Sequence, residues 1–286
     1  MEIANSGEKW NTKLFRILNS AMSFCIAYIF LTIGDFFSKS FSAKVFGIKN
    51  TVYFHGVRYF SEYKDWYPKS SIVIHSSGLV FVAVSSVIAW ALLRQTTRFD
   101  TPVRMIFLWT YVIGICMICA QFMSAAFGVS DYHSPFAIDF TFTIAWLYIK
   151  PPIAFMIAGF MVIVMAASTF FIVRPFLLFA YSYRKVYKLK ARRKFFYEIA
   201  IIPCFIGVLF TTTLIFPEKY IFVHLLQSLY MLAAMLIGWY ILFYVDVDYD
   251  AVWRHTGLEK VNFTLIALLI AATVFTQTVL QKGVSF

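Results

Sequence analysis

Charged residues are scarce in this sequence: Asp, Glu, Lys and Arg make up 14% of its 286 residues, while hydrophobic residues make up 61%. A water-soluble domain carries about 25% charged residues and needs a polar surface. The shortage excludes an ordinary soluble fold and predicts that hydrocarbon surrounds much of the chain. The 33 Phe, 17 Tyr and 7 Trp residues agree, because aromatic rings suit both the acyl region and the headgroup boundary of a membrane.

Acidic residues are scarcer still: 14 Asp and Glu stand against 25 Lys and Arg, for a net charge of +11. In a soluble protein this excess would suggest a nucleic-acid partner. Here no aqueous domain is large enough to carry one, so we expect no nucleic acid to bind. The basic residues lie in short loops, where they fix topology and contact anionic lipid.

Cysteine is also rare, and all four residues lie inside apolar stretches: Cys25, Cys116, Cys119 and Cys204. This placement predicts buried free thiols rather than a disulfide framework. Cys116 and Cys119 have CxxC spacing, so a redox pair is an alternative. A reactive thiolate would need a nearby cation or a helix N-terminus, and neither is visible in mid-span. We predict no cofactor other than bound lipid.

Long apolar stretches predict seven transmembrane helices, since one span needs about 20 mostly apolar residues. The predicted spans cover residues 17–37, 72–93, 105–128, 153–173, 197–216, 220–245 and 263–281. Six spans are the alternative, if the first or last stretch only lies at the interface. The predicted fold class is therefore all-α: a polytopic transmembrane helix bundle, forming one integral membrane domain over residues 1–286.

The distribution of Lys and Arg predicts an orientation. Cytoplasmic loops carry an excess of basic residues, and the densest basic run covers residues 184–194. This run shares a side with the N-terminus when seven spans alternate. We therefore predict that the N-terminus is inside and the C-terminus outside.

Two longer outer segments depart from the pattern of short loops. Residues 38–71 mix aromatic and charged side chains, which suits a helix or hairpin lying flat on the headgroups. Residues 131–150 are too apolar for open water and too interrupted to span comfortably. An interfacial or re-entrant segment is the natural prediction for them.

Polar residues inside predicted spans are functional candidates, because burying them in a membrane is costly. The candidate intramembrane polar or transport residues are Arg174, Glu198, His75, His224 and Gln227. Arg174 is intramembrane if its helix continues past it. It reaches the inner headgroups if the span ends near Val173 and Pro175 begins a turn. Glu198 either pairs with the basic residues just before it or serves a proton or cation relay. Asp35 is expected at the outer boundary.

Histidines fall at a similar outer depth on two spans. His75 and His224 could converge with His55 or His133 on a metal, since imidazole is a common ligand. No HxxxH or HxxE pair supports this, so hydrogen bonding between helices is the favoured interpretation. His224 and Gln227 share one helical face.

Two further groups of residues have candidate roles at the membrane surface. The candidate lipid-headgroup residues are Lys185, Lys188, Arg192, Arg193, Trp66 and Tyr67. Asp246, Asp248 and Asp250 form a DxDxD run, which is a weak candidate for a metal. Helical geometry would scatter these carboxylates, so an acidic loop facing the basic 184–194 loop is preferred.

Catalytic motifs are missing: the nucleophile elbow, the zinc-protease helix and the phosphate-binding loop do not occur. The leading hypothesis is a non-enzymatic integral membrane protein, either a transport or channel component or a subunit of a larger complex. Its partners would be membrane lipids and other membrane subunits. The alternative is a lipid- or polyisoprenoid-modifying enzyme that uses His75, His224 or the Asp246–Asp250 cluster. A weaker idea is ion conduction past Glu198 and Arg174.

Overall fold

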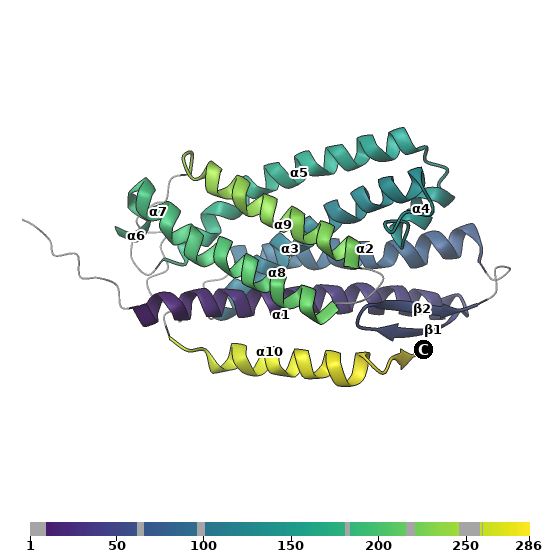
Figure 1. Cartoon of the computed structure of the whole chain (residues 1–286), viewed down its shortest axis with the longest axis horizontal. Helices are drawn as coiled ribbons and strands as arrows, with labels where there is room; N and C mark the ends of the chain where they lie inside the picture. Colours follow the sequence, from purple (N-terminus) through teal and green to yellow (C-terminus); the bar gives the residue numbers. More distant parts are fainter. Residues whose placement is uncertain are drawn as a thin grey trace, which may run out of the picture.

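Seven apolar helices, each long enough to cross a membrane, lie side by side in the computed structural model (Figure 1). The structure describes residues 10–61, 66–95, 101–180, 184–215, 221–245, 258 and 260–286, without the side chains of residues 184, 185 and 215. The spans are α1 (Trp10–Val45), α2 (Pro68–Arg94), α3 (Thr101–Ser130), α5 (Pro151–Leu178), Leu189–Leu214, α9 (Ile221–Ile241) and Phe263–Leu280. The prediction of seven spans is confirmed, and the chain is an integral multi-pass membrane protein.

Two of the spans are assembled from shorter helical segments. The span Leu189–Leu214 consists of α7 (Leu189–Phe196), the π-helical turn η2 (Tyr197–Ile201) and α8 (Ile202–Ile215). The span Phe263–Leu280 joins α10 (Phe263–Phe275) to a second π-helical turn, η5 (Thr276–Leu280). Pro203 lies two residues after the end of η2, and its missing N–H and bulky ring explain why the helix widens there.

The bundle has two different ends, which we name by their contents (Figure 1). At the N-terminal end lie the start of α1, the short helix α6 (Arg184–Tyr187) and α7. At the hairpin end lie strands β1 (Lys49–Tyr53), β2 (Gly56–Phe60) and β3 (Val284–Ser285), together with the short helix α4 (Phe140–Trp146). Each span connects the two ends, and successive spans run in opposite directions.

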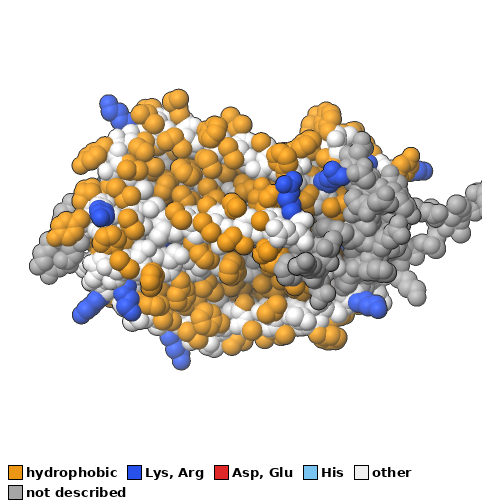
Figure 2. Space-filling model, turned by 180° about the vertical axis from the view of Figure 1, so that it is seen from behind, with side chains coloured by type: hydrophobic (Ala, Val, Ile, Leu, Met, Phe, Trp, Pro, Cys, Tyr) orange, Lys and Arg blue, Asp and Glu red, His pale blue; other side chains and the backbone are white. Residues whose placement is uncertain are grey.

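Helix α3 forms the centre of the bundle and α10 its edge. Of the apolar span in α3, 72% is buried, against 17% in the span Phe263–Leu280. Helix α3 packs against α1, α2, α5 and α9, whereas α10 packs against α1. On the face shown in Figure 2, hydrophobic side chains cover the middle of the molecule, and Lys and Arg gather toward its ends. That distribution is typical of a surface solvated by lipid.

An aromatic cluster fills the middle of the bundle. Trp109 of α3 makes edge-to-face contacts with Phe24 of α1 and Phe176 of α5, both at 5.0 Å between ring centroids. Phe176 also contacts Phe196 at 5.7 Å. Gly207 of α8 lies against the ring of Phe24, and a Cβ there would come within 2.1 Å of it. Small residues let transmembrane helices approach this closely.

A small antiparallel sheet closes the hairpin end, in the strand order β2-β1-β3. Val52 pairs with Val57 and Val284, and its side chain is fully buried. The all-α prediction holds for the membrane-crossing elements, and this sheet is an addition to it. Of the two forms predicted for residues 38–71, a hairpin forms, although α1 first continues to Val45.

Helix α5 also runs further than one of the two predictions for its end. Pro175 lies inside the helix, which ends at Leu178. The next two side chains, Phe176 and Leu177, are fully buried in the core. Their packing outweighs the loss of one backbone hydrogen bond at proline, so the expected turn at Pro175 does not form.

Candidate polar site at the hairpin end

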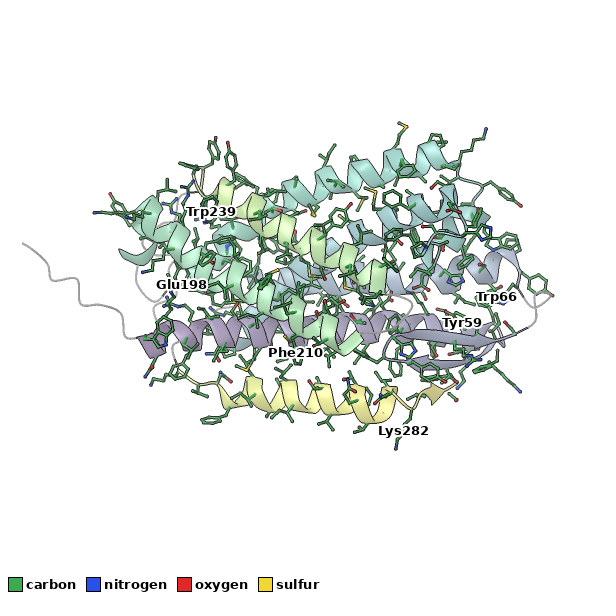
Figure 3. All side chains as sticks on the ribbon, in the orientation of Figure 1. Tyr59, Trp66, Glu198, Phe210, Trp239 and Lys282 are labelled. Atoms are coloured by element: carbon green, nitrogen blue, oxygen red, sulfur yellow. The ribbon has the colours of Figure 1, made fainter. Side chains whose placement is uncertain are left out.

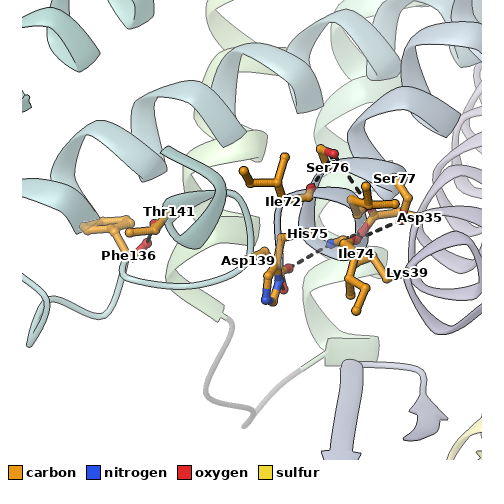
Figure 4. A network of polar contacts seen from close by, with 11 residues as sticks. Asp35, Lys39, Ile72, Ile74, His75, Ser76, Ser77, Phe136, Asp139 and Thr141 are labelled. Atoms are coloured by element: carbon orange, nitrogen blue, oxygen red, sulfur yellow. Dashed lines mark hydrogen bonds and ion pairs between the residues drawn. The ribbon is translucent and has the colours of Figure 1, made fainter. Parts of the chain in front are cut away.

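A buried lysine between two carboxylates is the centre of the candidate site (Figure 4). The Nζ atom of Lys39 donates to Oδ2 of Asp35 at 2.7 Å and to Oδ2 of Asp139 at 2.9 Å. Asp35 and Lys39 are four residues apart on α1, so they lie on the same face. Asp139 comes from the segment just before α4. The Lys39 side chain is 1% exposed, so its charge is compensated almost entirely by these two acids.

Glycine on α2 lets the backbone of that helix approach the lysine and its partners. A Cβ at Gly78 would lie 2.0 Å from Oδ1 of Asp35 and 2.6 Å from Cε of Lys39. No real side chain tolerates such contacts, so any substitution must displace the two charged groups. Helix α2 thereby fixes the position of the ion pair as well as covering it.

Asp139 adopts an unusual backbone conformation, with φ of 44°. Such values are costly for residues other than glycine and persist where the surroundings hold them. Burial alone would raise the pKa of Asp139, but the charge of Lys39, assisted by His75, holds this pKa below its ordinary value. The carboxylate therefore stays ionised and bonded to Lys39 at neutral pH.

His75 lies against Asp139 inside a cage of aromatic rings. Its Nδ1 atom is 4.0 Å from Oδ1 of Asp139, too far for a hydrogen bond. Trp66 stacks on the imidazole at 5.6 Å between centroids, and Tyr59 and Phe142 contact it at 5.9 and 5.1 Å. Trp66, a predicted headgroup residue, thus packs against His75, while Tyr67 beside it is exposed.

A second polar group joins α1 to α9. The hydroxyl of Tyr28 is 2.6 Å from Nδ1 of His224 and donates to Oε1 of Gln227 at 3.3 Å. His224 and Gln227 are themselves 3.2 Å apart on one face of α9. All three side chains are buried. This interhelical bonding agrees with the favoured interpretation for His224, whereas Nδ1 of His75 makes no hydrogen bond to a described residue.

Both groups border a cavity of about 40 Å³. One water needs roughly 10–15 Å³ by this measure, so there is room for a few water molecules or one small ion. The lining includes polar residues from α1, α3, α9, the hairpin and the segment before α4: Thr32, Asp35, His55, Gln121, Ser124, Asp139, His224 and Gln227. The Asp139 side chain is 31% exposed, which connects the site to the surface at the hairpin end.

Three buried oxygens of cavity-lining residues lack a well-formed hydrogen bond within the described part of the chain. They are Oγ1 of Thr32, Oδ1 of Asp35 and Oε1 of Gln121. Each of these side chains is at most 7% exposed. The side chain of Gln121 lies within reach of Asp35, and that of Tyr28 lies within reach of Thr32. Buried acceptors without partners are costly. A hydrogen-bond donor or a cation in the cavity would offset this cost by bonding to these oxygens.

Glu198 belongs to a separate cluster at the N-terminal end (Figure 3). Its two carboxylate oxygens lie 3.5 Å from Nζ of Lys13 and from a guanidinium nitrogen of Arg16. Both partners come from α1, not from the basic residues that precede Glu198 in the sequence. The π-helical turn η2 carries Glu198 toward α1. The structure therefore separates Glu198 from the histidines by most of the bundle's length.

The basic residues of the 184–194 run have different surroundings. Arg192 is buried, and its guanidinium donates to the carbonyls of Val186, Tyr187, Leu242 and Val245. It thus satisfies carbonyls just beyond α9 rather than a headgroup. Arg193 lies over the rings of Trp239 and Phe243, at 4.5 and 4.1 Å. Lys188 is exposed, and the side chain of Lys185 lies outside the described residues.

The other candidates from the sequence do not join the site. Arg174 lies on the exposed surface of α5, within the helix. Asp246, Asp248 and Asp250 fall outside the described residues. All four cysteines are free and buried, and the Sγ of Cys119 donates to the carbonyl of Met161. In the described part of the chain, no group of three His, Cys, Asp or Glu residues could hold a metal ion.

Lys39 and Asp139 are the important residues that the sequence analysis did not single out. Lys39 falls in the predicted outer segment 38–71, because the first span was expected to end at residue 37. One signal was available: an Asp and a Lys four residues apart can neutralise each other and allow a helix to continue. Nothing local identifies Asp139, whose partner lies 100 residues earlier in the chain.

Comparisons with protein-family models, with curated proteins and with solved structures find no match to this chain. The interpretation of the site therefore depends on its own chemistry.

Proposed function

We propose that this protein is a transport component that binds a small polar solute in the cavity beside Lys39. The observation that carries the proposal is the combination of a buried charged triad with a cavity that reaches the surface at one end. Ionisable groups at membrane depth are costly and typically mark the path of a substrate or ion. Catalysis is not needed to account for this arrangement.

The aromatic cluster in mid-bundle supports a one-sided site. Phe24 lies between Arg16 and Asp35 on α1, and its fully buried ring packs against Trp109, which in turn contacts Phe176. A solute that enters from the hairpin end would stop at this barrier. Such a closed barrier on one side is what an alternating-access cycle requires in each of its end states.

The orientation remains part of the proposal. The basic 184–194 run lies at the N-terminal end, opposite the hairpin, and the positive-inside bias then puts the cavity on the outer side. The 38–60 region and α4 would lie at the outer interface. Single cysteines at Lys188 and at Lys49 should react with an impermeant maleimide from opposite sides of sealed vesicles. Reaction from one side only would contradict the seven-span topology.

The alternative, a lipid-modifying enzyme, has one observation in its favour. His75 and His224 approach the same carboxylate region, since His75 lies beside Asp139 and His224 lines the cavity with it. Such an enzyme would need the two imidazoles to exchange protons with a substrate. Turnover of a lipid headgroup by the purified protein, abolished in both His75→Gln and His224→Gln, would favour this alternative over transport.

Bound lipid and partner subunits are also proposals. The span Phe263–Leu280 contacts the bundle mainly through α1 and leaves most of its surface exposed. Either lipid or a neighbouring subunit would cover this face in the membrane. Mass spectrometry of the protein released from native membranes would distinguish the two, because a subunit adds a stoichiometric polypeptide mass.

Transport is tested directly with the purified chain in sealed proteoliposomes. Gradients of small ions and small polar solutes are applied one at a time, and charge movement or tracer uptake is recorded. We expect a flux that is lost in Asp35→Asn and retained in Asp131→Asn, which removes an exposed acid at the same end. A correctly folded protein that moves none of the solutes would refute the proposal.

A further inference from the structure

The charges around the cavity do not balance. Asp35 and Asp139 provide two carboxylates, and Lys39 provides one ammonium that bonds both. Among the residues described as lining the cavity there is no Lys or Arg. Two carboxylates against one ammonium leave one excess negative charge at the site.

The unsatisfied atoms of the cavity are all oxygens. Lys39 bonds Oδ2 of Asp35, and the other carboxylate oxygen, Oδ1, lies close to the backbone of Gly78 on α2. Gln121 lies beside Asp35, and Thr32 is one helical turn before it on α1. A carboxylate, an amide oxygen and a hydroxyl together form a set of hard ligands for a cation. An anion would find only more negative charge here.

We propose that the cavity binds one small monovalent cation, either sodium or a proton, with the Asp35 carboxylate as its anchor. This inference rests on the proposed transport function, for which it names the substrate class. A single positive charge neutralises the excess of one, whereas a divalent ion would overcompensate it. The room for only a few waters excludes a bulky organic cation.

The two forms of the cation make different predictions about pH. The titratable and charged groups that face the cavity or the triad are Asp35, Lys39 and Tyr28 on α1, His75 on α2, His224 on α9, His55 on the hairpin, and Asp139. A proton bound at Asp35 would make stability depend on pH in the absence of sodium. A bound sodium ion would instead make stability depend on sodium, and protons would compete with it.

Thermal unfolding of the detergent-purified full chain provides the measurement, followed by tryptophan fluorescence. Sodium replaces choline at constant ionic strength, over a series of pH values. A ligand that binds only the folded state stabilises it as RT ln(1 + [L]/Kd). We expect saturable stabilisation by sodium, or by protons alone in choline buffer.

Variants locate the site. Asp35→Asn should raise the half-saturating cation concentration by about 10- to 100-fold, the effect of losing one charged ligand. Gln121→Met, which removes an oxygen without changing charge, should weaken binding less and provides a second test if Asp35→Asn fails to fold. Asp131→Asn is the matched control and should bind as the parent does.

Three outcomes would overturn the inference. The first is equal stability in choline and in sodium with no rise in stability as the pH falls. The second is cation dependence that survives in both Asp35→Asn and Gln121→Met, and the third is stabilisation by an anion. The flux assay separates this failure from failure of the proposed function. Cation binding without any flux would retain the site and refute transport. Flux of a neutral solute without cation dependence would retain transport and refute the cation.

Discussion

At the N-terminal end of the bundle one acid, Glu198, lies between two cations (Figure 3). At the hairpin end, by contrast, one cation, Lys39, lies between two acids (Figure 4). The first cluster lies near the exposed basic residues of the 184–194 run, and Lys13 in it is 31% exposed. The second borders a cavity and leaves a carboxylate oxygen of Asp35 without a described hydrogen bond.

The difference indicates two roles for similar chemistry. The first cluster joins η2 to α1 through its ion pairs and holds these elements together. A cluster with surplus negative charge beside a cavity needs a ligand to complete it. Ion pairs buried in a protein stabilise it only when every member is satisfied. Substitutions in the hairpin-end cluster should therefore lower the free energy of unfolding more than substitutions in the N-terminal cluster.

The largest effect is expected from Lys39→Met. This change leaves two carboxylates in a buried site without their cation, and breaking such a pair typically costs about 3–5 kcal/mol. The measurement is the free energy of unfolding in mixed micelles, by denaturant titration. The double variant Asp35→Asn with Lys39→Met should recover part of the loss. A single variant as stable as the parent would show that the triad contributes no stability.

The next effect is expected from Glu198→Gln at the opposite end. Glutamine keeps the shape of the side chain but removes the charge that Arg16 and Lys13 share, at a cost of about 1.5–3 kcal/mol. The same titration measures it. Because this cluster is remote from the cavity, cation dependence should remain that of the parent. A change in cation affinity would contradict the separation of the two clusters.

A somewhat smaller effect is expected from Gly78→Ala. The added methyl group must displace Asp35 or Lys39, and overpacking of this kind costs about 1–3 kcal/mol. Gly159→Ala on α5 is the matched control, because no neighbouring atom lies within 4 Å of a Cβ at that position. The control should be neutral or slightly stabilising. Equal stability of the two variants would mean that α2 does not pack closely against the triad.

The smallest effect concerns acid. The pKa of Asp139 is lower in the folded protein than the ordinary aspartate value of about 3.9. Its ion pair therefore contributes fully above about pH 4 and is lost as the pH falls through the lower folded-state pKa. Asp139→Asn should flatten the acid limb of stability against pH, whereas Asp131→Asn should leave it unchanged. An unaltered acid limb in Asp139→Asn would show that the Asp139 carboxylate does not contribute to the pH dependence of stability.

The number and approximate position of the spans followed from the sequence, because lipid exposure imposes long apolar runs that hydropathy detects directly. The predicted ends of two helices were wrong where polar residues or proline interrupt an apolar run. Asp35 and Lys39 made the first span look finished near residue 37, yet their mutual neutralisation lets α1 continue to Val45. The turn predicted at Pro175 does not form either, because burial of the two residues after it keeps α5 helical to Leu178.

The candidate site was predictable only in parts. His75, His224 and Gln227 were selected because polar residues in apolar runs are unusual. Their convergence with Asp139 depends on the fold of the 131–150 segment, and no periodicity encodes that. Likewise, Glu198 was selected as a candidate, but its partners lie about 180 positions earlier on α1 and not in the basic run beside it. Pairing between distant segments is a property of the assembled bundle.

The bare backbone at Gly207 has a mechanical consequence. Helix α8 lies directly on the ring of Phe24, which also contacts Trp109 and stacks near Tyr28. A sliding movement of α8 would therefore press on or release this ring, which lies on α1 between Arg16 and Asp35. The position of α8 and the position of the Phe24 ring are thus coupled, because Gly207 carries a hydrogen atom where another residue would have a side chain.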